Sequence, residues 1–130
     1  MEKQSMRSQY HFRRRGDHVL VWDVRKLVVL SRDLPREEVS VATIRELDER
    51  YWFSDEGLEP TCRAVVEHAR LIQEADPSFP IILSSDGGVM DGMHRVAKAV
   101  LQGRSTVMAV RFPVDPPPDF TDVSANELPY

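Results

Sequence analysis

The sequence predicts a small α+β domain in which helices pack on a short mixed sheet. The first observation is length, because 130 residues suit one domain with a modest hydrophobic core. The second is a pair of stretches with helical periodicity, and the third is a set of short apolar stretches on either side of them. Between residues 39 and 112 these elements follow the order β–α–β–β–α–β, within a single domain expected to span residues 18–112.

The chain begins with a segment that has little apolar periodicity. Residues 1–17 hold five basic and two acidic residues, and we interpret them as a flexible basic arm. The stretch HVLVWDV at 18–24 is rich in β-branched and aromatic residues and predicts a strand or an extended entry segment. Residues 24–34 fit either a buried strand or a helix that Asp23 caps and Pro35 stops, and we favour the helix.

The middle of the chain predicts a strand, an acidic and aromatic segment and a long helix. VSVATI at 39–44 alternates as a short strand does, and RELDERYWF follows it. SDEGLEP at 54–60 is typical of a loop. Residues 61–76 predict a helix that Thr61 caps. The apolar face of this helix is expected to contain Val65, Val66, Ala69, Leu71 and Ile72.

The next segment predicts a hairpin, a helix and a closing strand. PIILSS at 80–85 has the composition of a buried strand, DGG is a tight turn, and VMD is a short returning strand. A helix over 92–102 ends at Gly103, and residues 105–112 form the closing strand. The apolar face of this helix is expected to contain Val96, Ala97, Val100 and Leu101.

Charge is distributed unevenly along the chain. The formal net charge is −4, which argues against a nucleic-acid footprint over the whole surface and makes nucleic acid a less favoured partner. Residues 113–130 contain four acidic residues and five prolines. We expect them to form an extended acidic tail. If this tail docks on the domain, the residues expected to hold it are Phe120, Leu128 or Tyr130.

Composition also limits the compartment and the chemistry. The single cysteine, Cys62, excludes an internal disulfide and a zinc site built from several thiolates. No stretch approaches the roughly 18 apolar residues of a membrane helix, and the N-terminus lacks a signal-peptide pattern, so we expect a cytoplasmic protein without a membrane partner. Walker A, HExxH, GxSxG and GxGxxG patterns are absent, so P-loop, metalloprotease, hydrolase and dinucleotide functions lack support.

The most informative chemical pattern is MDGMHR, at the start of the 92–102 helix. A helix N-terminus presents unpaired N–H groups and about half a positive charge, and Gly92 allows close approach of a ligand. His94 and Arg95 fall in the first turn, with Lys98 one turn further on the same side. These donors suit a phosphate or another anion, and Asp91 could hold Mg²⁺ or orient His94.

The same residues also allow a purely structural interpretation. Asp91 would then be the N-cap, Arg95 a surface ion-pair partner, and His94 a residue packed against the hairpin. His68 is likewise first expected to pack or to form an ion pair. The aromatic residues 51–53 are first expected in the core or at its rim, with stacking on a base as the alternative.

The stretch PIILSSDGGVMDGMHRVAKAVLQGRSTVMAVRF resembles the core of the ParB/sulfiredoxin fold superfamily. That core has a strand, a turn, a G-x-[HR]-R helix start, a helix of small residues, a glycine and a closing strand. With the strand at 39–44 and the helix at 61–76, the resemblance covers residues 39–112. It implies that residues 18–112 form one ParB/sulfiredoxin-like domain.

Two branches of this superfamily fit the sequence poorly. Sulfiredoxins place a nucleophilic cysteine immediately before the His-Arg pair, whereas this chain has Met93, whose thioether cannot act as that nucleophile. Chromosome-partitioning ParB proteins bind CTP at a comparable helix start and clamp DNA with an added helix-turn-helix domain. Because of Met93 we expect no sulfiredoxin activity. Because only the proline-rich segment follows Phe112 we expect no centromere binding, whereas nucleotide binding remains expected.

The free-serine kinases of this fold carry a DGHHR-like motif that binds nucleotide phosphates, and MDGMHR is similar to it. Asp91, Gly92, His94 and Arg95 match that motif, and Met93 departs from it. The resemblance implies a phosphate site at this helix start. With Lys98 added by its helical spacing, we expect the phosphates to contact Gly92, Met93, His94, Arg95 and Lys98, and Asp91 to be the metal ligand. Those kinases also place a catalytic glutamate just after the entry strand. The candidates for this residue are Glu46, Asp48 and Glu49, with Glu37 and Glu38 as a competing match.

We therefore expect a protein that binds a nucleotide or another phosphorylated small molecule, with Mg²⁺ and ATP, ADP or CTP as cofactors. As an enzyme it would transfer a phosphoryl group to a small hydroxyl compound or hydrolyse a nucleoside triphosphate. The alternative is a non-catalytic regulatory module that binds nucleotide or nucleic acid through the same residues and the basic arm. The sequence leaves the substrate and the oligomeric state open.

Overall fold

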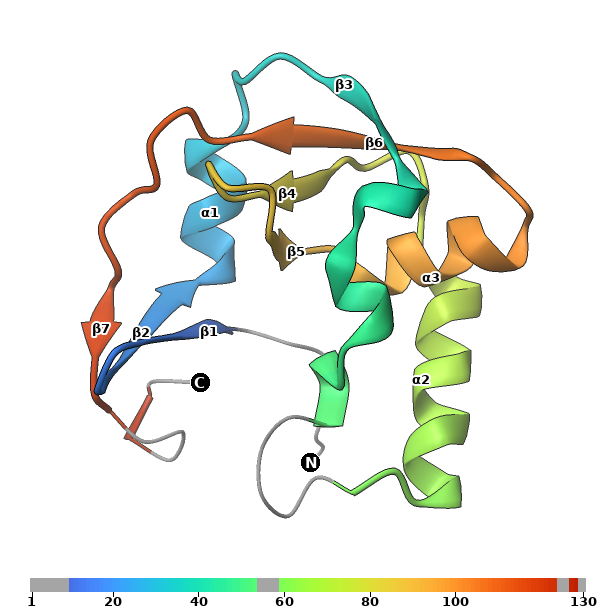
Figure 1. The fold of residues 1–130 in the computed structure, drawn as a ribbon, viewed down its shortest axis with the longest axis horizontal. Helices are drawn as coiled ribbons and strands as arrows, with labels where there is room; N and C mark the ends of the chain where they lie inside the picture. The colour runs from blue at the N-terminus through green and yellow to red at the C-terminus, as the bar shows by residue number, and fades with distance from the viewer. Residues whose placement is uncertain (1–9, 54–58, 124–126, 129–130) are drawn as a thin grey trace.

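Four strands form the central sheet of the domain (Figure 1). The computed structural model describes residues 10–53, 59–123 and 127–128. The sheet has the order β3-β6-β4-β5, and its strands are β3 (Glu37–Ser40), β6 (Thr106–Arg111), β4 (Ile81–Leu83) and β5 (Val89–Asp91). β4 runs parallel to β6, and the other two pairings are antiparallel. The predicted small α+β fold with a mixed sheet is confirmed.

A second sheet joins the two ends of the described chain. β1 (Tyr10–Arg15) and β2 (His18–Asp23) form an antiparallel hairpin, and β7 (Phe120–Thr121) pairs with the other side of β2. The prediction of a flexible arm over 1–17 is therefore wrong for residues 10–15, while residues 1–9 lie outside the described part. Tyr10 is buried, and the Arg13 guanidinium lies over the Trp22 ring, so the basic stretch docks through both side chains.

The predicted acidic tail docks on the same sheet. The Asp119 and Asp122 amides donate to the Val21 and Val19 carbonyls, both at 2.8 Å, on either side of β7. Phe120 is half-buried and lies edge-on to Tyr10, with ring centroids 6.3 Å apart. Docking through Phe120 is thus confirmed.

Three α-helices lie in the described residues: α1 (Val24–Leu30), α2 (Cys62–Glu74) and α3 (Met93–Leu101). The Asp23 carboxylate accepts from the Arg25 amide at 2.9 Å and caps α1, and the Thr61 hydroxyl accepts from the Ala64 amide at 3.1 Å and caps α2. Both caps are as predicted. None of the helices in the described ranges is long and apolar enough to span a membrane.

The segment between β3 and α2 departs from the prediction. The strand expected at 39–44 ends at Ser40, and three short 3₁₀ helices follow: η1 (Val41–Thr43), η2 (Arg45–Asp48) and η3 (Tyr51–Phe53). A strand would direct Ile44 to the face opposite Val39, whereas the 3₁₀ turns bring both side chains into the same core, where Ile44 is 2% exposed. Residues 54–58 of the predicted loop lie outside the described part.

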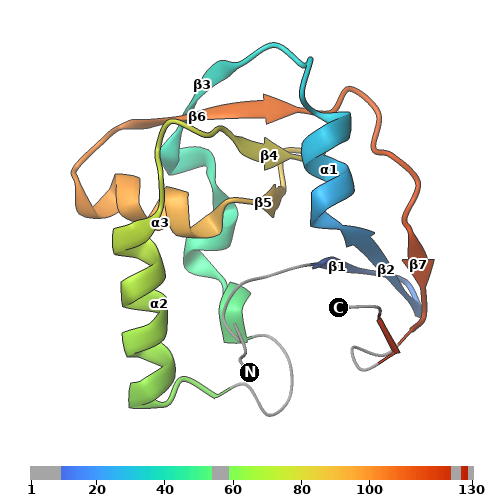
Figure 2. The same ribbon diagram turned by 180° about the vertical axis from the view of Figure 1, so that it is seen from behind.

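The central sheet has a hydrophobic core on each face, between the elements arranged around it in Figures 1 and 2. α1 and the second sheet lie on one side, where the core contains Trp22, Leu27, Ile82, Met90, Val110 and Phe112. The 3₁₀ helices, α2 and α3 lie on the other side, where the core contains Val39, Ile44, Ile81, Leu83, Val89, Met93, Val96 and Ala109. Successive residues of β4 therefore enter opposite cores, as the two-residue period of a strand requires.

The predicted apolar faces of α2 and α3 are only partly correct. In α2 the buried residues are His68 and Leu71, whereas Val65 and Val66 are exposed. In α3 the buried residues are Met93, Val96 and Ala99, whereas Val100 and Leu101 are exposed. The buried stripe of α2 includes an imidazole, and counting aliphatic residues alone therefore shifts its predicted face.

Candidate functional site

A pocket of about 190 Å³ lies between the 3₁₀ segment and α3. Its lining residues are Glu46, Leu47, Glu49, Arg50, Tyr51, Trp52, Phe53, Met93 and Ala97. Most of the lining is apolar or aromatic, and its charged groups come from η2 and from the two residues after it. Such a pocket suits a small molecule with an apolar or flat part that is oriented by a few polar groups.

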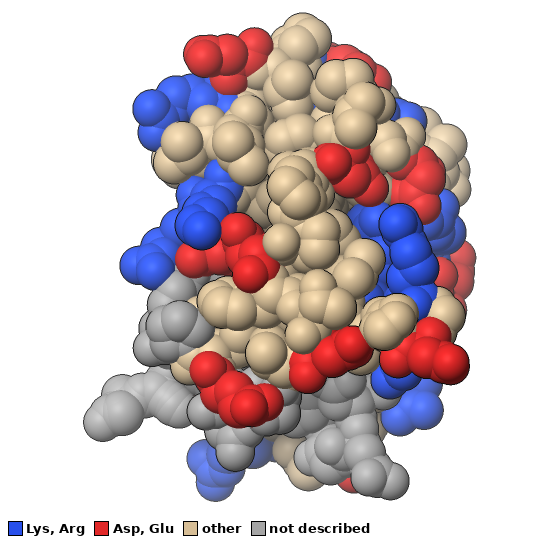
Figure 3. Space-filling view, turned by 90° about the vertical axis from the view of Figure 1, so that its left-hand side faces the viewer, with Lys and Arg blue, Asp and Glu red and all other residues tan. Residues whose placement is uncertain are grey.

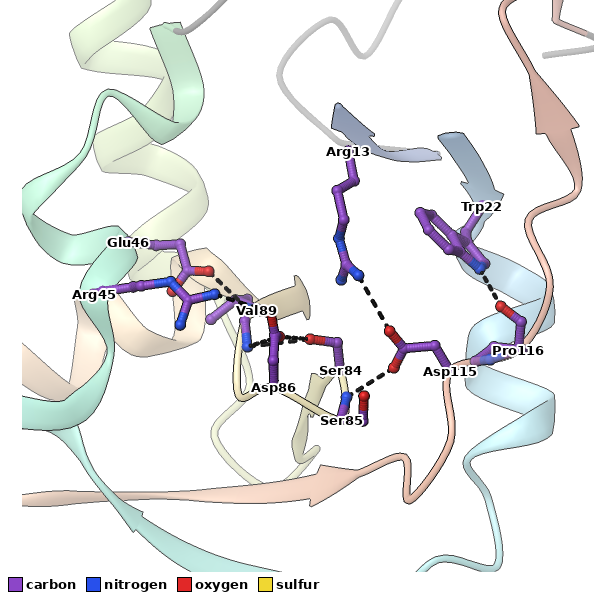
Figure 4. A network of polar contacts seen from close by, with 11 residues as sticks. Arg13, Trp22, Arg45, Glu46, Ser84, Ser85, Asp86, Val89, Asp115 and Pro116 are labelled. Carbon is purple, nitrogen blue, oxygen red and sulfur yellow. Dashed lines mark hydrogen bonds and ion pairs between the residues drawn. The ribbon is translucent and has the colours of Figure 1, made fainter. Parts of the chain in front are cut away.

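Glu46 is the buried carboxylate of this pocket. One of its oxygens, Oε2, accepts from the Val89 amide at 2.9 Å and fixes the side chain against β5 (Figure 4). The other oxygen, Oε1, is buried and has no hydrogen-bond partner among the described residues. The whole residue is 8% exposed, whereas Asp48 and Glu49 are exposed. The structure thus separates the three predicted catalytic carboxylates, with Glu46 the one held in the interior.

Tyr51 connects Glu46 to the predicted motif. Its hydroxyl donates to the Val89 carbonyl at 3.3 Å, so the amide and the carbonyl of Val89 are bound by Glu46 and Tyr51 respectively. Burial raises the pKa of the Tyr51 phenol, and the nearby carboxylates of Asp91 and Glu46 raise it further. Tyr51 therefore stays protonated and serves as a hydrogen-bond donor between two carboxylates.

Asp91 ends β5 beside the start of α3. Burial raises the pKa of its carboxyl, against the opposing effects of the Arg95 guanidinium and the Gly92 amide. Arg95 Nη2 lies 3.7 Å from its Oδ2. The described residues contain no group of three histidine, cysteine, aspartate or glutamate side chains that could hold a metal ion. Asp91 is instead paired with Arg95, so these residues do not fit a preformed magnesium site.

The glycine of the motif is explained by packing. Gly92 is the N-cap of α3 and has φ +106°, in the left-handed region that favours glycine. A Cβ atom at this position would lie 2.7 Å from Cγ2 of Ile81 and 2.8 Å from Nη1 of Arg95. The absence of a side chain therefore allows the helix start to approach β4 and the Arg95 side chain.

Arg95 and Lys98 are bound within the protein. Arg95 Nη1 donates to the Pro80 carbonyl at 2.9 Å, in addition to its ion pair with Asp91. Lys98 Nζ donates to the carbonyls of Gln73 and Ala75, both at 2.8 Å, and so caps the C-terminal end of α2. The predicted phosphate-binding side chains thus lie near one another along α3, but these two cations point to backbone carbonyls.

Met93 and His94 occupy the other side of the first turn of α3. Met93 is buried in the core and lines the pocket beside Glu46. The His94 ring stacks on Trp52, with centroids 4.5 Å apart, and its Nε2 lies 2.9 Å from Nδ1 of His68. Trp52 therefore lines the pocket and His68 supports it from α2, although the sequence pattern assigned both first to packing. The aromatic run of residues 51–53 was the signal that could have identified Trp52.

The β4–β5 turn beside Glu46 is densely paired (Figure 4). The Asp86 carboxylate accepts from the Ser84 hydroxyl and from the Gly88 amide, and Arg45 Nη2 lies 3.4 Å from its other oxygen. These donors hold the pKa of Asp86 down at about 2. On the other side of the turn, the Asp115 carboxylate joins the Ser85 amide to Arg13 of β1. The turn that positions Val89 is therefore fixed from both sides.

The surface carries charges of both signs. On the face shown in Figure 3, basic and acidic side chains alternate around uncharged surface, and neither sign covers it. This face therefore lacks the continuous positive field that nucleic-acid binding uses. No family model, curated protein or solved structure matches this chain.

Proposed function

We propose that this chain is a ParB/sulfiredoxin-like domain that binds a nucleotide at the pocket between η2–η3 and α3. In this proposal Glu46 acts as the base for phosphoryl transfer to a small hydroxyl compound. The observation that carries it is the unpaired Oε1 of Glu46. A buried carboxylate oxygen without a donor costs free energy, on the order of 1–3 kcal/mol or more, and a bound hydroxyl group would supply the missing donor.

The lining of the pocket supports a nucleotide or a similar ligand. Tyr51, Trp52 and Phe53 provide aromatic surface on which a flat base can stack. Arg50 is an exposed guanidinium in the same lining and is the cation we assign to a phosphate group, since Arg95 and Lys98 are bound to carbonyls. The backbone amides of the first turn of α3 add the positive end of a helix dipole.

The proposed reaction follows from the position of Glu46. The oxygen of the bound hydroxyl group attacks the terminal phosphorus and its proton passes to Oε1 of Glu46. The bond from that phosphorus to the bridging oxygen breaks, and the oxygen leaves with the nucleotide that is one phosphate shorter. The Val89 amide holds Oε2 throughout, so the accepting oxygen is oriented before the substrate arrives. Met93 takes no part in the transfer and contributes apolar surface.

Replacing the Glu46 carboxylate by an amide tests the proposal. ATP, ADP and CTP are each added with Mg²⁺ and a set of small alcohols, and the melting temperature and phosphoryl transfer are measured. The Glu46→Gln variant keeps an oxygen for the Val89 amide but loses the base, so we expect binding to persist and turnover to fall by about 10²–10⁴-fold. Asp48→Asn is the matched control in the same segment, because Asp48 is exposed and outside the pocket lining, and it should retain turnover.

A second candidate function is a non-catalytic nucleotide-binding module. The observation that favours it is the internal pairing of Arg95 and Lys98, which leaves fewer cations for the charge that develops in a transferring phosphate. A rise in melting temperature without turnover in the unmodified protein supports this module. If none of the three nucleotides changes the melting temperature, both candidate functions are wrong.

A further inference from the structure

Two histidines and a tryptophan form a compact cluster where α2, α3 and η3 meet. The His68 and His94 rings lie against Trp52, with centroids 4.3 Å and 4.5 Å from the tryptophan ring and planes 17° and 13° from parallel. Phe53 contacts His68 edge-on at 5.2 Å. His68 is 5% exposed, so the cluster lies mostly within the protein.

The two imidazoles share a proton-dependent contact. Nδ1 of His68 lies 2.9 Å from Nε2 of His94, and the ring centroids are 5.1 Å apart. In such a hydrogen bond one nitrogen donates and the other accepts, so at least one ring must be neutral. When both rings are protonated, the bond is lost and two positive charges face each other in a partly buried place.

We propose that His68 and His94 form a proton-controlled latch that holds Trp52 in place and thereby shapes the adjacent pocket. With at least one ring neutral, the hydrogen bond joins α2 to α3 and both rings support the indole. With both rings protonated, the contact breaks and Trp52 leaves its stacked position. Because Trp52 and Phe53 line the pocket, opening the latch removes part of its aromatic surface.

The charged and titratable neighbours belong to each of the packed elements. On α2, Glu67 favours the protonated form of His68, but burial has the larger effect and lowers the pKa of His68 below its ordinary 6.5. On α3, Arg95 and Lys98 are bound to carbonyls, and Arg95 is also paired with Asp91 of β5. Beside η3, Tyr51 has a raised phenol pKa and stays neutral. Burial therefore favours the neutral form of His68. Because the latch opens only when both rings are protonated, it should open only below about pH 6.5.

Tryptophan fluorescence can test the latch without any ligand. The chain has two tryptophans, so a Trp22→Phe background leaves Trp52 as the reporter. Between about pH 8 and about pH 5 we expect the emission to move to longer wavelength, with a midpoint below 6.5 and unchanged far-ultraviolet circular dichroism. In a His68→Gln variant, whose amide can bond His94 but does not titrate, this transition should disappear.

His18→Gln is the matched control, because His18 is an exposed histidine paired with Asp122 on the opposite part of the fold. It should keep the transition. Ring-nitrogen NMR of the unmodified protein gives a second measurement, in which the His68 and His94 signals should titrate together. An emission that stays constant over this range with independent ring titrations, or a transition that persists in His68→Gln, contradicts the latch.

The effect on binding rests on the proposed function and is measured separately. For whichever of ATP, ADP or CTP raises the melting temperature, the affinity should weaken at least about tenfold between pH 8 and pH 5, corresponding to one pKa unit of linkage. His68→Gln should make the affinity nearly independent of pH. A fluorescence transition without any nucleotide binding supports the latch and rejects the proposed function, whereas binding that is equally tight at both pH values rejects the control of the pocket.

Discussion

The start of α3 and the η2–η3 segment meet at one pocket, but they differ in how completely their polar groups are paired. At the start of α3, Arg95 and Lys98 donate to backbone carbonyls of neighbouring elements. In η2, Glu46 pairs one oxygen and leaves the other buried without a donor among the described residues. The start of α3, which carries the MDGMHR motif, therefore has its polar groups more completely hydrogen-bonded than η2 does.

This difference separates stabilising groups from ligand-binding groups. A paired and buried polar group lowers the free energy of the folded state and has little left to offer a ligand. A buried group with a missing partner is retained at a cost, and a ligand can offset that cost. On this criterion we propose Glu46 as the ligand-binding group, whereas Gly92 and Lys98 mainly hold α3 in place.

The largest expected effect comes from Gly92→Ala. The new methyl group would combine left-handed backbone strain, about 1–2 kcal/mol, with a clash against Ile81, about 1–3 kcal/mol. We expect the free energy of unfolding to fall by about 3 kcal/mol, measured by urea denaturation. If the variant instead kept its stability and lost nucleotide binding, the start of α3 rather than η2 would be the ligand site.

Gly103→Ala is the control for this substitution. Gly103 also has a positive φ, +70°, but a Cβ atom there would meet nothing within 4 Å. The alanine should therefore cost only the backbone strain, about 1 kcal/mol. Equal losses at the two positions would show that the close approach of Gly92 to Ile81 contributes nothing.

Lys98→Met should have an intermediate effect. The variant keeps the apolar stem but removes two hydrogen bonds to the last carbonyls of α2, which we expect to lower the free energy of unfolding by about 1–2 kcal/mol. The nucleotide-dependent rise in melting temperature should stay the same. Lys26→Met, which removes an exposed ion pair with Asp119, is the surface control and should cost less than about 1 kcal/mol. Weaker binding at unchanged stability would instead assign Lys98 to the phosphate.

Local rules predicted much of the fold. Asp23 and Thr61 cap their helices as their side chains suggest, and the DGG turn joins β4 to β5, because each feature depends on a few adjacent residues. The pairing of Tyr10–Arg15 with β2, and of β2 with β7, was not predicted. Arg13 of β1 contacts Trp22 and Asp115, which lie at positions that no local pattern connects to it.

The candidate site was predicted only to within a segment. Three carboxylates of residues 46–49 were equivalent in the sequence, and the choice of Glu46 depends on the 3₁₀ turn that directs it toward Val89. The stacking of His68 and His94 on Trp52 joins three separate elements, so spacing along any one of them gives no signal. The helical spacing of aliphatic residues also predicted the wrong buried face for α2, because that face contains the imidazole of His68.

The smallest expected effect is that of Asp86→Asn, which replaces a fully paired carboxylate close to Glu46. The folded state lowers the pKa of Asp86 from 3.8 to about 2, so its stabilising contribution is complete above pH 3.8 and is lost as the pH falls toward 2. Its side chain is 61% exposed, and solvent screening reduces the contribution to about 1 kcal/mol. The variant should be less stable than the unmodified protein by that amount near neutral pH and equally stable near pH 2.

Turnover is the measurement that separates Asp86 from Glu46. Asp86→Asn should leave turnover unchanged, because every polar contact of Asp86 lies within the turn or with Arg45. Asp48→Asn, at an exposed carboxylate of η2, should change neither stability nor turnover and sets the baseline for both measurements. If Asp86→Asn reduces turnover as strongly as Glu46→Gln, the hydrogen-bond pairing of a carboxylate does not tell whether it takes part in the reaction. The turn would then affect the substrate indirectly, through the Val89 amide that orients Glu46.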